Sequence, residues 1–294
     1  MFYDVINKLM EKERLADLSL IIVSLIWGSS FIIIKDSLTY INEYFLLVIR
    51  FGTAAIILGL YLLFKKINPF KSNVLKEGAI LGLILFIALG TQTVGLKYTT
   101  ATNSAFIHSL YVVLTPIFAA LLFKKFPKTW CIFAVILATL GLFLLTFNST
   151  LGFYFNFGDL ITLVTAVALA FQILYTDKYV KKSDPFSLGF IEFGVMTLLS
   201  VIFTILFGSI PTNFDSHITF SLIYLGVVVT FIAYFTQIVA QKFTHPLKVA
   251  VIFSLEPVFA GIFSFIFASE ILNLINLLGA GLIFLGMVIA EIKK

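Results

Sequence analysis

Charged residues and cysteine are scarce in this chain. Only 12% of its 294 residues are charged, whereas 60% are hydrophobic and the mean hydropathy is +1.08. A chain of this composition has too little polar surface to fold as a water-soluble globule. Cys131 is the single cysteine, which excludes an internal disulfide and a metal site built of cysteines. The composition therefore indicates an integral membrane protein.

Patterns for binding metals and nucleotides are also lacking. The three histidines, His108, His217 and His245, are spread along the chain and form no cluster of ligands. No glycine-rich run ends in Gly-Lys-Ser or Gly-Lys-Thr, so a phosphate-binding loop for ATP is excluded. The connections between hydrophobic runs are too short to hold a soluble catalytic domain. We therefore expect no metal and no cofactor.

Long hydrophobic runs fill most of the chain. A helix needs about 20 apolar residues to cross the hydrocarbon core of a bilayer. The sequence contains ten such runs, and they predict an all-α integral membrane protein with ten transmembrane helices. The runs cover, in outline, residues 15–34, 44–64, 77–96, 101–123, 130–147, 158–177, 185–208, 219–241, 246–268 and 271–291.

The chain contains an internal repeat. When the sequence is shifted by 145 residues, Thr91–Leu145 aligns without a gap with Thr236–Ala290, and fifteen positions are identical. The identities include polar residues such as Gln92 and Gln237, which an apolar composition alone does not explain. Because each copy holds an odd number of spans, the second copy enters the membrane from the opposite side. Two inverted five-helix repeats are typical of secondary transporters.

The repeat and the charges predict the organisation of the chain in the membrane. We expect a cytoplasmic interfacial helix over residues 1–14, a first five-helix repeat over 15–147 and a second over 158–291. Lysine and arginine concentrate on the face that holds the N-terminus, and only Lys35 and Lys97 fall on the other face. Both termini are therefore expected on the cytoplasmic side of the cell membrane. The net charge of +5 is explained by the lipid bilayer and needs no nucleic-acid partner.

Polar side chains within the spans are the candidates for a functional site. The most polar types cost about 2.5–3.5 kcal/mol each when they are inserted into a membrane, so they require a partner or a wet cavity. We expect nine of the polar and aromatic residues in the spans to line a substrate cavity: Trp27, Ser30, Gln92, Asn103, His108, Tyr111, Gln172, Tyr175 and Gln237.

Glu256 is a candidate proton carrier or counter-charge for an amine on the cargo. It lies close to the middle of its span and directly precedes Pro257. A proline leaves a carbonyl free one turn earlier, so the helix kinks and a polar notch can open. The alternative is a protonated glutamic acid that is hydrogen-bonded to this carbonyl. Pro116 predicts a second kink, in the helix that carries His108.

Arg50 and Glu192 occupy corresponding places in the two copies, and each is followed by Phe-Gly. Inversion places them in different halves of the membrane, so the symmetry does not imply an ion pair between them. We expect each to secure its own helix end, by snorkelling or by pairing with a neighbour. A role in gating is the alternative.

Several short motifs occur in a fixed order along the chain: Leu25–Phe31, Arg50-Phe51, Gly95–Ala101, Gly158–Leu160 and Ser254–Val258. With these motifs the chain resembles the EamA family of the drug/metabolite transporter superfamily, from about residue 18 to its end. The resemblance implies a central cavity lined by both halves and alternating access by rocking helices. Family members of similar sequence export amino acids, related metabolites or toxic compounds, and some carry purines or cofactors. At Ala170–Gln172 the chain departs from the tryptophan that many second copies carry, which argues against aromatic stacking on that side.

We therefore expect a secondary transporter that exports a small metabolite, an amino acid first of all, driven by protons or by the gradient of the cargo. Drug-like or cationic compounds and purines are the alternative cargoes. An intramembrane enzyme is disfavoured, because Ser29, Ser30 and His108 form no Gly-x-Ser-x-Gly elbow. A passive channel is disfavoured as well, because the spans carry no charged ring or filter.

Overall fold

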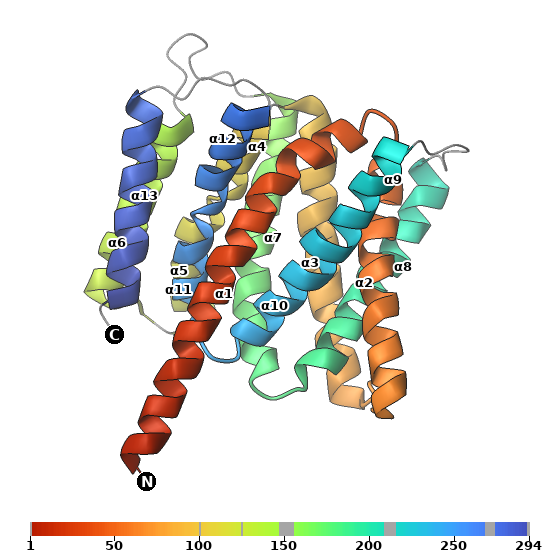
Figure 1. Cartoon of the computed structure of the whole chain (residues 1–294), viewed down its shortest axis with the longest axis horizontal. Helices are drawn as coiled ribbons and strands as arrows, with labels where there is room; N and C mark the ends of the chain where they lie inside the picture. The colour runs from red at the N-terminus through yellow and green to blue at the C-terminus, as the bar shows by residue number, and fades with distance from the viewer. Residues whose placement is uncertain are drawn as a thin grey trace.

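The protein is an assembly of helices in the computed structural model (Figure 1). The structure describes residues 2–99, 101–124, 126–146, 156–208, 216–267 and 274–292, and these ranges contain no strand. The all-helical fold predicted from the hydrophobic runs is confirmed for them. The elements are α1 (Phe2–Ser37), α2 (Glu43–Lys65), α3 (Ser72–Tyr98), α4 (Ala101–His108), α5 (Tyr111–Phe123), α6 (Thr129–Thr146), α7 (Phe157–Val180), α8 (Pro185–Phe207), α9 (Ser216–Ile223), the π-helical η1 (Tyr224–Ile232), α10 (Ala233–Ala240), α11 (Pro246–Phe253), α12 (Glu256–Phe267) and α13 (Leu274–Ile292).

The chain passes back and forth between the two ends of a helical bundle (Figure 1). In this view α1 runs from the N-terminus at the bottom to the top, α2 returns to the bottom, and α3 runs upward again. The first half ends at the top of α6, and α7 then runs downward. The C-terminal end of α13 points toward the same end of the bundle as the N-terminal end of α1.

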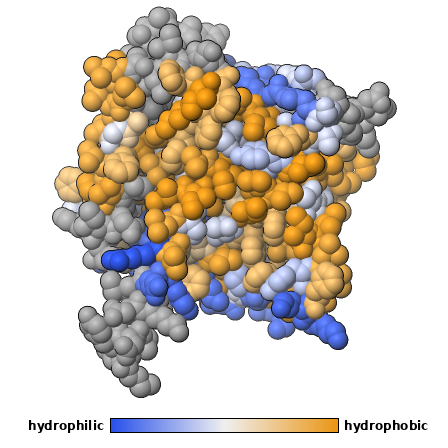
Figure 2. Space-filling view, viewed as in Figure 1, coloured by the Kyte–Doolittle hydropathy of each residue, from blue (hydrophilic) through white to orange (hydrophobic). Residues whose placement is uncertain are grey.

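Seven helical segments in the described ranges are long and apolar enough to cross a membrane. Figure 2 shows hydrophobic residues over the middle of the visible face and hydrophilic residues along its lower edge and part of its upper edge. The protein is therefore a multi-pass membrane protein. Shorter apolar stretches occur at Tyr111–Leu122, Ile132–Gly141 and Leu277–Gly286, so the count of ten spans stays a prediction.

The first helix is continuous over 36 residues, from Phe2 to Ser37. The segment 1–14, which the sequence assigns to a helix on the membrane surface, therefore joins the first span without an interruption after Phe2. Ion pairs join the N-terminal part of α1 to α11. Lys248 Nζ lies 2.6 Å from Asp17 Oδ2 and 3.3 Å from Glu13 Oε1.

Two helices are interrupted at corresponding places of the repeat. The turn Ser109–Leu110 separates α4 from α5, and the turn Ser254–Leu255, which follows 145 residues later, separates α11 from α12. In each turn the serine hydroxyl donates a hydrogen bond to a preceding carbonyl, that of Ala105 in the first half and that of Val251 in the second. Such bonds compete with the helical main-chain bonds and bend helices. The repeat therefore encodes the interruption twice.

The two prolines stand in different relations to these interruptions. Pro257 lies in the first turn of α12, so its missing N–H leaves the carbonyl of Phe253, four residues earlier, without its usual helical partner. Pro116 lies inside α5, which continues through it to Phe123. The helix that carries Pro116 is interrupted earlier, at Ser109–Leu110, and not at the proline.

The two halves of the chain pack into each other. α6 packs against α13, α3 against α7 and α8, α2 against α8, and α1 against α12. At the crossing of α1 and α12, a Cβ atom added to Gly28 would lie 2.6 Å from Phe259 Cβ and 2.9 Å from the carbonyl oxygen of Glu256. Only a glycine at this position lets α1 lie directly against the first turn of α12.

We predict that Gly28→Ala lowers the thermal stability of the purified protein, because the new methyl group forces α1 away from the backbone of α12. Overpacking of this kind costs about 1–3 kcal/mol. Gly90→Ala is the matched control, since no atom lies within 4 Å of its added Cβ. The measurement is the unfolding temperature of both variants in detergent. An equal unfolding temperature for the two variants would contradict the close crossing at Gly28.

Candidate substrate cavity

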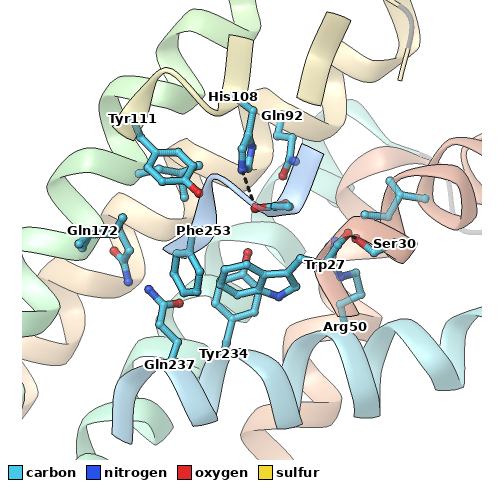
Figure 3. Close-up of a pocket in the computed structure, with 14 residues that line it drawn as sticks. Trp27, Ser30, Arg50, Gln92, His108, Tyr111, Gln172, Tyr234, Gln237 and Phe253 are labelled. Atoms are coloured by element: carbon cyan, nitrogen blue, oxygen red, sulfur yellow. Dashed lines mark hydrogen bonds and ion pairs between the residues drawn. The ribbon is translucent and has the colours of Figure 1, made fainter. Parts of the chain in front are cut away.

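A cavity lies between helices of both halves, beside the two interruptions (Figure 3). Its unfilled space amounts to 490 Å³ when the part open to solvent is included. Eight residues expected from the sequence at a cavity or proton site line this space: Trp27, Ser30, Gln92, His108, Tyr111, Gln172, Gln237 and Glu256.

Two further residues were expected at the cavity, Tyr175 and Asn103. Tyr175 lies on α7 outside the lining, with its ring centroid 5.6 Å from that of Tyr179 and the ammonium of Lys178 5.5 Å above its ring. Tyr175 therefore contacts residues in the last turn of α7. The side chain of Asn103 lies outside the described residues.

The cavity lining also contains six residues that were not expected there from the sequence. Tyr234 and Phe253 were hidden among eleven tyrosines and thirty-four phenylalanines, so their residue type alone carried no signal. The internal repeat did give a signal for Phe253, because a shift of 145 residues aligns Phe253 with His108, a residue expected at the cavity. The six are Ile34, Arg50, Leu169, Ile173, Tyr234 and Phe253.

The two interruptions bring charged and polar side chains of both halves into contact. His108 ends α4 and Glu256 begins α12, and their Nε2 and Oε2 atoms lie 3.5 Å apart in a buried setting. The first turn of a helix stabilises a carboxylate, because its free N–H groups carry partial positive charge. Tyr111 begins α5 and lies edge-on to His108, with ring centroids 5.5 Å apart. Tyr111 and Glu256 are equivalent in the repeat, so one position supplies a phenol in the first half and a carboxyl in the second.

Four polar atoms at the cavity have no hydrogen-bond partner in the described part of the chain. They are His108 Nδ1, Tyr111 Oη, Gln172 Oε1 and Glu256 Oε2. Each buried polar group without a partner costs about 1–3 kcal/mol. Folded proteins contain few such groups, and those that persist generally bind water, an ion or a ligand. Their concentration at one cavity makes this cavity the candidate functional site.

An aromatic wall made of Trp27, Tyr234 and Phe253 forms another part of the lining. The Trp27 ring centroid lies 4.6 Å from that of Tyr234 and 4.9 Å from that of Phe253. The indole N–H donates a hydrogen bond of 3.1 Å to the carbonyl of Val229 in η1. Short π-helical segments are frequent at functional sites. This bond and the ring contacts fix the orientation of the indole in the cavity.

Arg50 lies inside the bundle, with 2% of its surface exposed, and it lines the cavity. Its Nε donates a hydrogen bond of 3.0 Å to Thr230 Oγ1, and the Thr230 hydroxyl donates in turn to the carbonyl of Leu225 within η1. In Figure 3 the Arg50 side chain lies beside Trp27 and Ser30. Of the two alternatives expected for Arg50, pairing with a neighbour is the one found, and snorkelling to the membrane surface is not.

Glu192 lies behind the cavity wall and is also buried, with 1% of its surface exposed. Its Oε1 accepts a hydrogen bond of 2.6 Å from Gln172 Nε2, while its Oε2 has no partner among the described residues. For Glu192 too, pairing with a neighbour is found in place of snorkelling. Gln172 thus connects the cavity to a second buried carboxyl.

The repeat-related glutamines differ in their contacts. Gln237 Nε2 donates to Gln241 Oε1 at 3.2 Å, and Gln241 donates to the carbonyl of Ile173 at 3.0 Å. Gln237 thus both lines the cavity and joins α10 to α7. Gln92 lines the cavity from α3, and its amide makes no hydrogen bond to a described residue.

Ion pairs join helices near each end of the bundle. Lys97 Nζ at the end of α3 lies 2.8 Å from Glu43 Oε2 at the start of α2. Lys248 near the start of α11 contacts Asp17 of α1. The end of α3 and the start of α11 lie at opposite ends of the bundle in Figure 1. The cavity therefore lies between two sets of charged contacts.

Comparisons with known proteins identify the family. The sequence pattern of the EamA-like transporter family matches the chain twice, over residues 14–147 and 156–291. A protein of Archaeoglobus fulgidus named as an uncharacterized transporter is 34% identical over 282 residues, which cover 96% of this chain and 87% of the relative. The transporter YdfC of Bacillus subtilis, also named as uncharacterized, is 28% identical over 270 residues, which cover 86% of this chain and 83% of YdfC. A solved crystal structure superposes with a TM-score of 0.80 at 16% identity, covering 95% of this chain and 99% of the other, which shows the fold alone.

The helical bundle and the related proteins show that this protein is a membrane transporter. The chain belongs to the EamA-like transporter family, whose pattern spans nearly all of it in two copies. Membership implies a small-molecule substrate and a membrane environment.

The unpartnered polar atoms predict that water reaches the cavity. In a Cys131→Ser background, Tyr111→Cys should react with a small water-soluble thiol reagent, because position 111 lines the cavity. Ser200→Cys should stay unmodified, since position 200 is fully buried on α8 outside the lining. Mass spectrometry of the intact protein measures both reactions. A position 111 thiol that is as inert as the one at position 200 would contradict a wet cavity.

Proposed function

We propose that this transporter exports a small amphipathic metabolite, an amino acid, by alternating access through the cavity between its two halves. The observation that carries the proposal is the set of unpartnered polar atoms between two interrupted helices. Interrupted helices at the interface of two repeats form the substrate sites of many secondary transporters. Their free backbone groups and polar side chains replace part of the hydration shell that the cargo loses.

The proposal includes ten spans arranged as two inverted halves, residues 15–147 and 158–291. Two observations support the inversion. α1 runs upward in Figure 1 whereas α7, which begins the second half, runs downward, and the interruptions recur at the same place of the repeat. The excess of lysine on one face supports cytoplasmic positions for both termini, with residues 1–14 at the inner membrane surface.

Alternating access requires that each end of the bundle open in turn. The pair Lys97–Glu43 joins α3 to α2 at one end, and the pair Lys248–Asp17 joins α11 to α1 at the other. Rigid helices that rock against each other exchange such contacts without unfolding. One pair is expected to separate in each open state while the other stays closed.

An intramembrane hydrolase is the alternative from another class, and the contacts of the two serines argue against it. Ser29 Oγ lies 2.6 Å from Tyr224 Oη, and Ser30 Oγ donates to the carbonyl of Trp27 at 2.8 Å. A serine nucleophile requires a base within hydrogen-bond distance. Among the described residues, neither hydroxyl is hydrogen-bonded to His108, and no group of three or more His, Cys, Asp or Glu could hold a metal ion.

Cationic or drug-like compounds are the second candidate cargo. The aromatic wall of Trp27, Tyr234 and Phe253 lies in the same cavity as Glu256. Aromatic faces next to a carboxylate attract organic cations, and they also stack on flat rings such as purines. This arrangement supports the alternative within the same transporter mechanism.

Flux into liposomes tests the transport proposal. Purified protein is reconstituted, and entry of radiolabelled amino acids, purines and organic cations is followed with and without an imposed pH gradient. A carrier gives flux that saturates and is competed by unlabelled cargo. Flux that rises linearly with concentration would indicate a channel, and chemical conversion of the compound would indicate an enzyme.

We predict that Glu256→Gln abolishes transport driven by a pH gradient and leaves exchange of labelled for unlabelled cargo partly intact, if this carboxyl carries the coupled proton. Glu192→Gln is the matched variant, because it removes the other buried carboxyl near the cavity and keeps the oxygen that accepts from Gln172. The measurement is pH-driven flux beside exchange in liposomes. Full proton coupling in Glu256→Gln, with loss in Glu192→Gln, would assign the proton to Glu192 instead.

A further inference from the structure

Arg50 is a buried cation without a carboxylate partner. Its one hydrogen bond in the described part of the chain uses Nε and goes to a neutral group, Thr230 Oγ1. No carboxylate of the described residues lies within ion-pair distance of its guanidinium. Arg50 lines the cavity, and its guanidinium carbon lies 5.7 Å from the centroid of the Phe51 ring. The guanidinium of this lining residue thus has N–H donors that no described residue uses.

A charge in this position is costly unless an anion compensates it. Removing a cation from water costs several kcal/mol, and the membrane interior offers no solvent to replace it. Arginine keeps its charge under all physiological conditions, and its planar fork donates two parallel hydrogen bonds to a carboxylate. Lys248, which is also buried, differs from Arg50 in having acidic partners at 2.6 and 3.3 Å. Among the described residues, the cavity therefore contains a buried cation, Arg50, that has no acidic partner, whereas Lys248 has two.

The opposite charge is present elsewhere in the same cavity. Glu256 Oε2 lies 3.5 Å from His108 Nε2 and makes no hydrogen bond within the described residues. Arg50, Tyr234 and Glu256 all line this cavity. The lining of one cavity therefore holds a basic and an acidic side chain.

We infer that Arg50 binds the carboxylate of the cargo through its terminal N–H groups, while Glu256 receives the ammonium group and the aromatic wall contacts the cargo side chain. The cargo class is a zwitterion with one carboxylate, an α-amino acid. This inference rests on the proposed transport function and names its recognition residue. Inorganic phosphate and phosphate esters fit less well, because Glu256 repels an anion of higher charge.

The binding test uses the tryptophan of the cavity as its reporter. The chain has two tryptophans, and Trp130→Phe leaves Trp27 as the single one. The fluorescence of Trp27 is titrated with each of the twenty standard L-amino acids. The amino acid with the largest response is then compared with its carboxamide, with its analogue that lacks the amine, and with inorganic phosphate.

The inference predicts that the amino acid binds at least about tenfold tighter than its carboxamide, since only the carboxylate forms a charge-assisted pair with the guanidinium. In the Trp130→Phe background, Arg50→Gln should remove this preference and leave the weak binding of the carboxamide unchanged. Arg50→Lys should restore part of it. Thr230→Val is the positioning control, because it removes the Nε partner and keeps the guanidinium, so the preference should fall only in part.

Several results would overturn the assignment of Arg50. These are equal binding of acid and carboxamide to the Trp130→Phe protein, an unchanged preference in Arg50→Gln, tighter binding of phosphate than of any amino acid, or no response to any amino acid. The comparison of acid with carboxamide needs no variant of Arg50, so a failure of Arg50→Gln to fold does not prevent the test. Saturable liposome flux of a cargo without a carboxylate would keep the transporter and remove this inference. Absence of saturable flux for all compounds would remove the proposed function itself.

Discussion

Backbone hydrogen bonding in a membrane is the constraint on which this structure depends. The hydrocarbon core offers no water, so a helix can be interrupted only where protein groups or a wet cavity satisfy the freed N–H and C=O groups. The turns Ser109–Leu110 and Ser254–Leu255 interrupt two helices, and the residues on both sides of each turn line the cavity. The interruptions therefore need the cavity to satisfy their backbone groups, and the residues beside the interruptions form part of the cavity lining. The close approach of α1 at Gly28 places the first turn of α12 against a third helix and holds this arrangement together.

The repeat duplicates the backbone of the site and changes its chemistry. His108 corresponds to Phe253, and Tyr111 corresponds to Glu256. One half thus contributes a histidine and a phenol where the other contributes an apolar ring and a carboxyl. An inverted pair of identical halves would offer the same groups to both ends of a cargo. The divergence at these positions instead makes one side acidic, while Arg50 of α2 supplies positive charge to the same space. The presence of both charges in one lining is the basis of the proposed zwitterionic cargo.

Much of the fold and of the site could be predicted from the sequence, for reasons that also explain what could not. Hydrophobic runs identify helices because the bilayer demands apolar length, and the polar residues inside them converge because burial without partners is costly. The sequence left open whether Arg50 snorkels or pairs with a neighbour, because a span position alone does not distinguish an arginine that snorkels from one that faces inward. Tyr234 carried no signal, since aromatic rings serve equally for lipid contact and for cavity walls. The interruption before Tyr111 follows from a serine turn, whereas the sequence draws attention to Pro116, which α5 accommodates.

Two inverted halves that enclose one cavity are the central claim, and the sidedness of two repeat-related positions tests it most directly. Lys97 follows the third span and Lys242 the eighth, so they are equivalent in the repeat, and the ends of α3 and α10 lie at opposite ends of the bundle in Figure 1. Lys97→Cys and Lys242→Cys, each in a Cys131→Ser background, are labelled in sealed right-side-out vesicles with a thiol reagent that does not cross membranes. The inverted arrangement predicts labelling at position 97 in sealed vesicles and at position 242 only after permeabilisation. Labelling of both positions from the same side would contradict it.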